Sequence, residues 1–286
     1  MSRTEGGLDA ALDNAIAGDD LPLETFLARV SGLPGLRPNL GFLDTFAKVC
    51  CARGIAADGV IARLVSKSAA YAPGASSYEF LPMAGVAALA ARGAADPTMY
   101  PRALAGLHAS ADDLRFRVRD RVVVGLTKLG ASQGQRLVDD TAGWMDGYFH
   151  AAAVVSALAD GAWLAKLETP SGVLGRLDEA FVLARDATRA AWRYPGHKAL
   201  VEALGATPSA VGLRFGVPLF DLLVGWSTTR EPALREVVAK CAALRTGRLS
   251  EQVQRLQHAL EATEEAPRDP RTVVGPTRQR GAKRRK

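Results

Sequence analysis

The sequence predicts an all-α fold: a right-handed solenoid of stacked antiparallel helix pairs, followed by a disordered basic C-terminal tail. Apolar residues follow helical spacing along nearly the whole chain, while alternating Val/Ile/Thr runs bounded by hairpin turns are almost absent. The apolar stripes are also short and numerous, which favours units that pack only on their neighbours. We therefore expect one helical repeat domain over residues 1–263 and a tail over 264–286.

The expected helices follow from these stripes and from the turn residues between them. Gly-, Pro- and Ser-containing breaks at 72–77, 168–172 and 194–196 are interpreted as turns between repeats. The expected ranges are 8–17, 23–30, 40–52, 58–70, 78–91, 97–109, 114–129, 133–145, 149–159, 173–193, 198–204, a stretch over 208–226 interrupted by Pro218, 232–245 and 250–263.

Residues 114–122 resemble a half-buried strand, because arginines alternate there with mostly apolar residues. The continuation to Leu129 decides for a helix, since one stripe follows helical spacing. Its members are Leu114, Val118, Val122, Leu126 and Leu129. Ser110, Asp112 and Asp113 are expected to cap the start of this helix.

The formal charge of +6 is concentrated at the C-terminal end. Residues 267–286 contain eight basic residues and one acidic residue, which gives +7, so the rest of the chain carries −1. Residues 264–286 also lack apolar periodicity, and we expect them to be disordered.

The remaining composition indicates a reducing, cytoplasmic setting. The N-terminal residues include acidic side chains before any apolar core of a signal peptide, and no run of about 18 apolar residues follows, so neither secretion nor stable membrane insertion is expected. Cys50, Cys51 and Cys241 have neither disulfide-framework nor metal-ligand spacing and are interpreted as small core residues.

Common catalytic signatures for nucleotide binding, zinc proteolysis and acyl transfer are missing from the sequence. The four histidines, His108, His150, His197 and His258, are scattered without metal-ligand spacing. We therefore predict no catalytic residue, no metal site and no cofactor.

Two Asp–Arg pairs with a six-residue separation, Asp96/Arg102 and Asp113/Arg119, resemble the second half of a HEAT repeat. Because the pairs are only 17 residues apart, they cannot both be the same element of full-length repeats. The segment around Arg119 also echoes the segment around Arg235, which follows Pro232 at an expected first helical turn. Much of 78–249 is similar to bacterial HEAT-repeat proteins, and the resemblance implies an Asp–Arg ladder between repeats.

Two sets of basic residues are candidate binding sites for a protein or nucleic-acid partner. On the helix 114–129, Arg115 and Arg119 lie on one surface, and Arg117, Arg121 and Lys128 lie on another. The alternative is an exposed face partly neutralised by Asp112, Asp113 and Asp120, with Arg119 in the repeat ladder. In the tail the candidates are Arg278, Arg280, Lys283, Arg284, Arg285 and Lys286, which can approach phosphates without a shaped site.

The function that these observations favour is a noncatalytic HEAT-like binding or scaffold protein whose tail adds electrostatic attachment to nucleic acid or an acidic partner. The alternative is a repair protein that resembles HEAT-like alkylpurine DNA glycosylases, suggested by Trp144, Trp163, Trp192 and Trp226. A concave cluster of an accessible carboxylate, aromatic rings and several arginines would favour the alternative. An apolar or mixed concave face would favour the binding protein.

Overall fold

The computed structural model describes residues 3–243 and 247–263 and contains only helices and turns within them. The α-helices are α1 (Arg3–Ile16), α2 (Leu21–Val30), α3 (Leu40–Arg53), α4 (Ile55–Val65), α5 (Phe80–Ala95), α6 (Tyr100–Ala111), α7 (Phe116–Gln133), α8 (Gln135–Asp140), α9 (Tyr148–Ala157), α10 (Gly161–Leu164), α11 (Ser171–Arg185), α12 (Pro195–Phe215), α13 (Val217–Trp226), α14 (Pro232–Ala242) and α15 (Ser250–Ala262). Four short 3₁₀ segments are η1 (Ser77–Glu79), η2 (Ala142–Asp146), η3 (Ala191–Arg193) and η4 (Gly247–Leu249).

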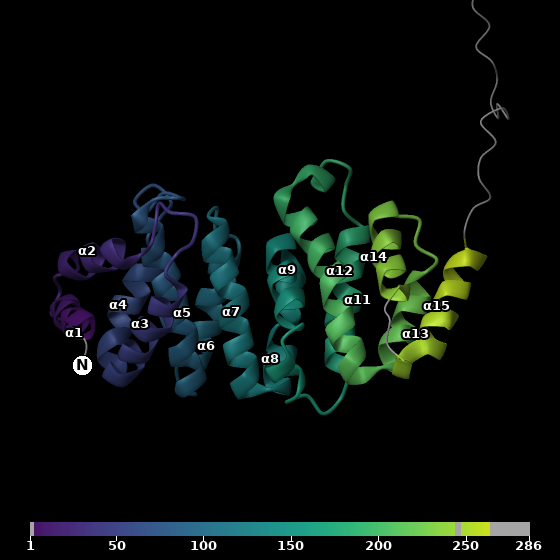
Figure 1. Ribbon diagram of the computed structural model, residues 1–286, viewed down its shortest axis with the longest axis horizontal. Helices are drawn as coiled ribbons and strands as arrows, with labels where there is room; N and C mark the ends of the chain where they lie inside the picture. The colour runs from purple at the N-terminus through teal and green to yellow at the C-terminus, as the bar shows by residue number, and fades with distance from the viewer. Residues whose placement is uncertain (1–2, 244–246, 264–286) are drawn as a thin grey trace, which may run out of the picture.

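The helices stand side by side in a row along the long axis, from α1 at one end to α15 at the other (Figure 1). One layer is continuous, because α3 packs on α5, α5 on α7, α7 on α9, α9 on α12 and α12 on α14. In the second layer, α8 packs on α11, α11 on α13 and α13 on α15. The all-α solenoid predicted from the sequence is confirmed. The proposed tail, 264–286, lies outside the described residues.

The predicted apolar stripe of α7 is buried from Val118 onward. This part of the stripe consists of Val118, Val122, Leu126 and Leu129, and each of the four side chains is at most 1% exposed. The prediction was wrong for Leu114, which is 86% exposed, because α7 begins two residues later at Phe116. A side chain before the first turn is not held on the helical stripe.

The predicted capping of α7 is also wrong in detail. Ser110 Oγ donates to the carbonyl oxygen of Gly106 inside α6, and the carboxylate of Asp113 accepts from the backbone N–H of Arg115. Arg115 is itself the residue that precedes the helix, in an extended conformation. The acidic residues therefore shape the turn between α6 and α7 and do not cap α7.

Two proline-containing segments differ from the sequence expectation. Pro208 lies inside α12, which runs unbroken to Phe215, whereas the sequence favoured a break before it. The expected helix 173–193 ends at Arg185, and Tyr194 is extended before Pro195 begins α12. This second boundary agrees with the preference of residues before proline for extended backbone.

One glycine allows an unusually close approach between α7 and α10. A Cβ built at Gly130 would lie 2.2 Å from Cδ2 of Trp163, which is fully buried. The indole Nε1–H of Trp163 donates to the carbonyl oxygen of Gly134 at 3.1 Å, so the ring is fixed in place. The close approach thus requires glycine at residue 130.

A buried ion pair links α4 to α5. Arg92 Nε donates to Asp58 Oδ1 at 2.8 Å and its Nη2 donates to Oδ2 at 3.1 Å, and both side chains are less than a tenth exposed. The hydrogen bond that Arg92 donates to Asp58 raises the pKa of Arg92 above its ordinary value, although burial opposes this shift. In this bidentate geometry, each buried charged group is hydrogen-bonded to a group of opposite charge.

The cysteine interpretation agrees with the structure: Cys50 and Cys241 are buried and Cys51 is partly buried, all three with free thiols. Among the described residues, no helix combines the length and the apolar character that crossing a membrane requires.

Candidate partner-binding groove

Arg115, predicted to face a partner, is directed into the protein. It is 5% exposed, and its Nη1 and Nη2 donate to the carbonyl oxygens of Ala72 and Lys67, both at 2.9 Å. Its Nε also donates to Asp113 at 2.8 Å. The guanidinium thus connects the turn after α4 to the start of α7. Few of its N–H groups remain free to bind an external phosphate.

The other basic residues of α7 also have partners within the chain. Arg117 donates to Glu79 at 2.9 Å, and Lys128 donates to Asp44 at 2.7 Å. Burial lowers the pKa of Arg121 below its ordinary value, and its Nε is buried without a hydrogen-bond partner among the described residues. A partner-binding role for these three residues stays a prediction.

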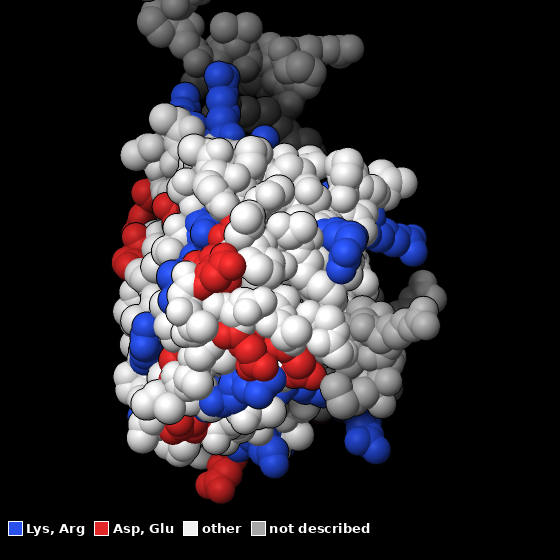
Figure 2. Space-filling model, turned by 90° about the vertical axis from the view of Figure 1, so that its left-hand side faces the viewer, with Lys and Arg blue, Asp and Glu red and all other residues white. Residues whose placement is uncertain are grey.

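The tail candidates Arg278, Arg280, Lys283, Arg284, Arg285 and Lys286 lie outside the described residues. Within the described part, opposite charges adjoin at the end formed by the N-terminal helices (Figure 2). There Arg53 contacts Asp9 and Asp13 at 3.1 Å each, and Arg63 contacts Asp20 at 2.8 Å. This end of the repeat body is therefore a mixed surface that includes these ion pairs.

The Asp–Arg pairs that resembled a repeat ladder are not formed. Asp96 contacts Arg92 at 3.3 Å, while Arg102 is exposed. Arg119 donates to the backbone carbonyl oxygen of Asp113 and not to its carboxylate. The six-residue spacing was therefore a poor guide to pairing, because local backbone acceptors and Arg92 lie closer.

Arg235, which the sequence pattern placed in the same structural role, binds backbone oxygens too. Its guanidinium donates to the carbonyl oxygens of Ser227 at 3.1 Å and Leu260 at 2.7 Å. It thereby joins the ends of α13 and α15 to α14. Arg235 therefore makes helix-end contacts with backbone oxygens, and its role as a repeat residue stays a prediction.

A groove crosses the layer formed by α7, α9, α12 and α14. It consists of two adjoining hollows, one between α7, α9 and α12 and one between α12 and α14, and both include Glu202 and Ala206. The α12 residues that line the first hollow recur at helical spacing. They are Pro195, Ala199, Glu202, Ala203 and Ala206. One face of α12 thus forms the centre of the groove.

The floor of the groove is made mostly of small apolar side chains. Ala152 and Ala153 of α9 lie opposite Ala199 and Ala203 of α12 in the first hollow. Gly205 and Val237 continue the floor into the second hollow. Because small side chains leave the space above them free, two closely packed helices here still present a depression.

Three carboxylates without hydrogen-bond or ion-pair partners among the described residues line the groove, namely Asp120, Glu202 and Glu231. Asp120 projects from α7 and Glu202 from α12, and both are exposed. Burial by neighbouring groups raises the pKa of Asp120 above its ordinary value, although Arg121 and Arg119 oppose the shift. A carboxylate that has lost part of its hydration without gaining a partner favours a cation beside it.

Aromatic rings and one arginine border the groove. The guanidinium carbon of Arg119 lies 4.1 Å from the centre of the Phe149 ring, and Phe149 lies 5.6 Å from Tyr194. Trp192 lines the second hollow and is 38% exposed. Of the described residues lining the two hollows, Arg119 is the only arginine, and Lys198 and Lys240 are the lysines.

The other tryptophans are structural. Trp163 and Trp144 are buried, and Trp226 is buried with its Nε1–H donating to Asp178 at 2.8 Å. These three rings therefore fill the spaces between helices, as large aromatic side chains commonly do. Trp192 alone among the four borders the groove.

Sequence reasoning missed both the groove and a contact between histidines. From the sequence, His108 and His150 were interpreted as scattered residues. In the structure their rings stack with centres 4.0 Å apart, which corrects that interpretation. The one local signal was Asp146 four residues before His150, a spacing that places two side chains on one helical face. The groove had no such signal, because alanine is equally common in cores and on surfaces.

No protein-family model and no curated protein sequence matches the chain. Among solved structures, a designed armadillo repeat protein aligns at 15% identity over 90% of this chain and 100% of the designed one, with a TM-score of 0.34. A similarity of this size carries no argument about function. The conclusions below therefore rest on the chain's own residues.

Proposed function

We propose that this chain is a noncatalytic, HEAT-like macromolecule-binding or scaffold protein whose groove over α7, α9, α12 and α14 receives a segment of a partner protein. The observation that carries the proposal is the groove itself: a small-residue floor with two unpartnered carboxylates, Asp120 and Glu202, at its centre. A solenoid commonly presents such an extended face to partners.

The chemistry of the groove favours an amphipathic, basic segment. Apolar side chains of the segment would cover the alanine floor, and its lysine or arginine would lie between Asp120 and Glu202. Glu236 is already paired with Lys240 at 3.0 Å, so Asp120, Glu202 and Glu231 provide the unmatched negative charge. Nucleic acid fits this groove poorly, because its phosphates would face the same carboxylates.

The mixed, mainly apolar lining supports the binding protein over the glycosylase-like alternative. That alternative needs several arginines beside a carboxylate and aromatic rings. The described groove brings together Asp120, Phe149 and Arg119, but Arg119 already contacts a backbone carbonyl and stacks on Phe149. It lacks the cluster of free cations that would hold a DNA backbone.

The groove is tested by selecting peptides from a random library on the full chain. We expect the selected peptides to combine apolar residues with lysine or arginine. Ala206 is exposed and lines both hollows, so Ala206→Trp fills their junction and should abolish binding. Ala239→Trp, on an exposed α14 position outside both linings, is the matched control.

Charge is tested with the same peptides. Glu202→Gln should weaken binding by about two- to fivefold, the effect of one exposed ion pair. Glu251→Gln, at an exposed position of α15, should have no effect. Selection of acidic peptides, or binding unchanged by Ala206→Trp, would contradict the proposal.

The basic tail is proposed to add electrostatic attachment to nucleic acid or an acidic partner. Residues 267–286 carry +7 while the rest of the chain carries −1, so deleting them should remove most salt-dependent DNA binding. Titration of the full chain and the deletion variant with duplex and single-stranded DNA at two salt concentrations measures this. Equal affinities and equal salt slopes for the two proteins would refute the role of the tail.

A further inference from the structure

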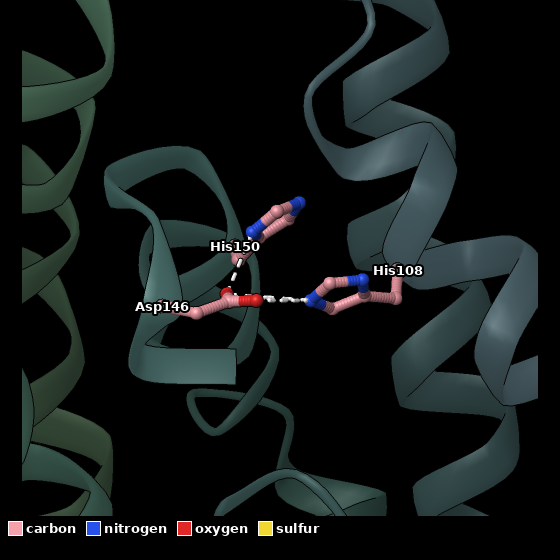
Figure 3. A group of neighbouring side chains, drawn as sticks. All are labelled: His108, Asp146 and His150. Atoms are coloured by element: carbon pink, nitrogen blue, oxygen red, sulfur yellow. Dashed lines mark hydrogen bonds and ion pairs between the residues drawn. The ribbon is translucent and has the colours of Figure 1, made fainter. Parts of the chain in front are cut away.

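Three side chains with metal-binding atoms converge between α6 and α9 (Figure 3). His108 comes from α6, Asp146 from the end of η2, and His150 from the first turns of α9. His108 Nε2–H donates to Asp146 Oδ2 at 3.1 Å, and His150 Nδ1–H donates to Asp146 Oδ1 at 2.8 Å. The two nitrogens and the carboxylate oxygens therefore face one another.

The distances are close to those of a metal-ligand set. One ligand atom from each residue lies within 4.8 Å of the others. In tetrahedral zinc sites, with bonds of about 2.0–2.1 Å, neighbouring ligand atoms are roughly 3.3 Å apart. The two histidine–aspartate distances, 3.1 and 2.8 Å, are slightly shorter than that value.

The surroundings hold the imidazoles in this arrangement. The rings of His108 and His150 stack at 4.0 Å with 22° between their planes, and the buried indole of Trp144 meets the edge of His108 at 4.9 Å. The stacking thus fixes both rings beside the Asp146 carboxylate, where each imidazole can offer a ring-nitrogen lone pair to a metal ion.

Solvent reaches the cluster from one side. Asp146 is half-exposed, and a cavity beside it is lined by Tyr100, His108, Arg136, Asp140, Trp144 and Asp146. An ion held by the three residues would keep a position open towards this cavity. Three protein ligands and one open position are also the arrangement of ions that bind water or a small anion.

We propose that His108, Asp146 and His150 bind a divalent transition-metal ion of the zinc class. The two imidazoles are borderline donors that select such an ion over calcium or magnesium, and a carboxylate is also a common zinc ligand. This site is separate from the groove residues on which the proposed function depends, so either proposal can fail alone.

Cobalt(II) and zinc provide the test with the full, untagged chain. Titration with Co²⁺ should produce the intense visible absorption of a tetrahedral site, and Zn²⁺ should displace it. Zn²⁺ should also raise the melting temperature, because an ion that binds only the folded chain stabilises it. Calcium should give neither effect.

Ligand variants locate the site. His108→Gln and His150→Gln should each weaken Zn²⁺ binding at least about 100-fold, more than the loss of an outer-shell contact. His258→Gln, at an exposed position of α15, should bind as the unaltered chain does. Circular dichroism of each variant without metal establishes that the fold is retained.

The absence of a Co²⁺ spectrum in the full chain would overturn the proposal and leave a purely structural cluster of hydrogen bonds. Binding that persists in the double variant His108→Gln/His150→Gln would place the ion elsewhere and would overturn it as well.

Discussion

Gly130→Ala should destabilise the protein, although alanine is the better helix former. In an unobstructed helix interior the substitution gains about 1 kcal/mol. Here the new Cβ would lie 2.2 Å from Cδ2 and 2.3 Å from Cγ of Trp163, far inside the contact distance of about 3.5–4.0 Å between carbon atoms. The indole is fully buried and held by its hydrogen bond to Gly134, so it cannot move away freely.

The magnitude follows from these opposing effects. Overpacking typically costs about 1–3 kcal/mol, and displacement of the ring would also weaken a hydrogen bond of about 1 kcal/mol. Because the overlap exceeds 1 Å at two ring atoms, we expect a value at the upper end and a net loss of about 2–3 kcal/mol. Urea denaturation followed by circular dichroism at 222 nm measures it.

Gly175→Ala is the matched control. Gly175 also lies inside a helix, α11, but a Cβ there would meet no atom within 4 Å. This substitution should stabilise the protein by about 0.5–1 kcal/mol. If both variants are more stable than the unaltered chain, the close packing of α7 on Trp163 is refuted.

Three further predictions concern the core. Val122→Asp puts an unpaired charge at a fully buried position and should lower the free energy of unfolding, measured by urea denaturation, by about 3 kcal/mol or more. An unchanged denaturation midpoint would place Val122 outside the core. Asp58→Asn leaves buried Arg92 with only the partly exposed Asp96, at 3.3 Å, as counter-charge and should cost up to about 3 kcal/mol. Asp58→Leu combined with Arg92→Met should lose less; equal losses would mean that the charge pairing is unimportant. Burial raises the pKa of Cys241 to about 12, so its alkylation by iodoacetamide in the folded chain should be slow at pH 8, and its rate should keep rising about tenfold per pH unit up to pH 10, as followed by peptide mass spectrometry. Because this folded-state pKa lies above that of the unfolded thiol, the contribution of Cys241 to stability is complete below the unfolded pKa and falls as the pH rises towards the folded one; a native alkylation rate that levels off near pH 9, as for an ordinary thiol, would contradict the shift.

Periodicity predicted the helices and the buried stripe of α7 because those features depend on neighbouring residues alone. Val118 and Val122 lie on that stripe whatever the rest of the chain does. The burial of Arg115 depends instead on carbonyl groups that precede it by more than 40 residues. No local pattern records such a contact, so Arg115 looked like part of a charged surface.

The groove and the histidine cluster were hidden for the same reason. His108 and Asp146 are 38 residues apart, and only the packing of α6 and η2 on α9 brings them together. In the groove, the alanines of α9 and α12 match either a core or a surface position. Their exposure is decided by which helices come to lie on either side.

The arginine contacts with backbone carbonyls have a mechanical consequence. Stacked helical repeats deform by shear, with each helix pair sliding on the next. Arg115 ties α7 to the turn after α4, and Arg214 ties α12 to the end of α10 through Leu164 at 3.2 Å and Leu167 at 2.7 Å. A displacement of about 1 Å takes such bonds beyond hydrogen-bond length. The helix pairs that these arginines connect therefore resist sliding, and bending of the solenoid is concentrated between other helix pairs.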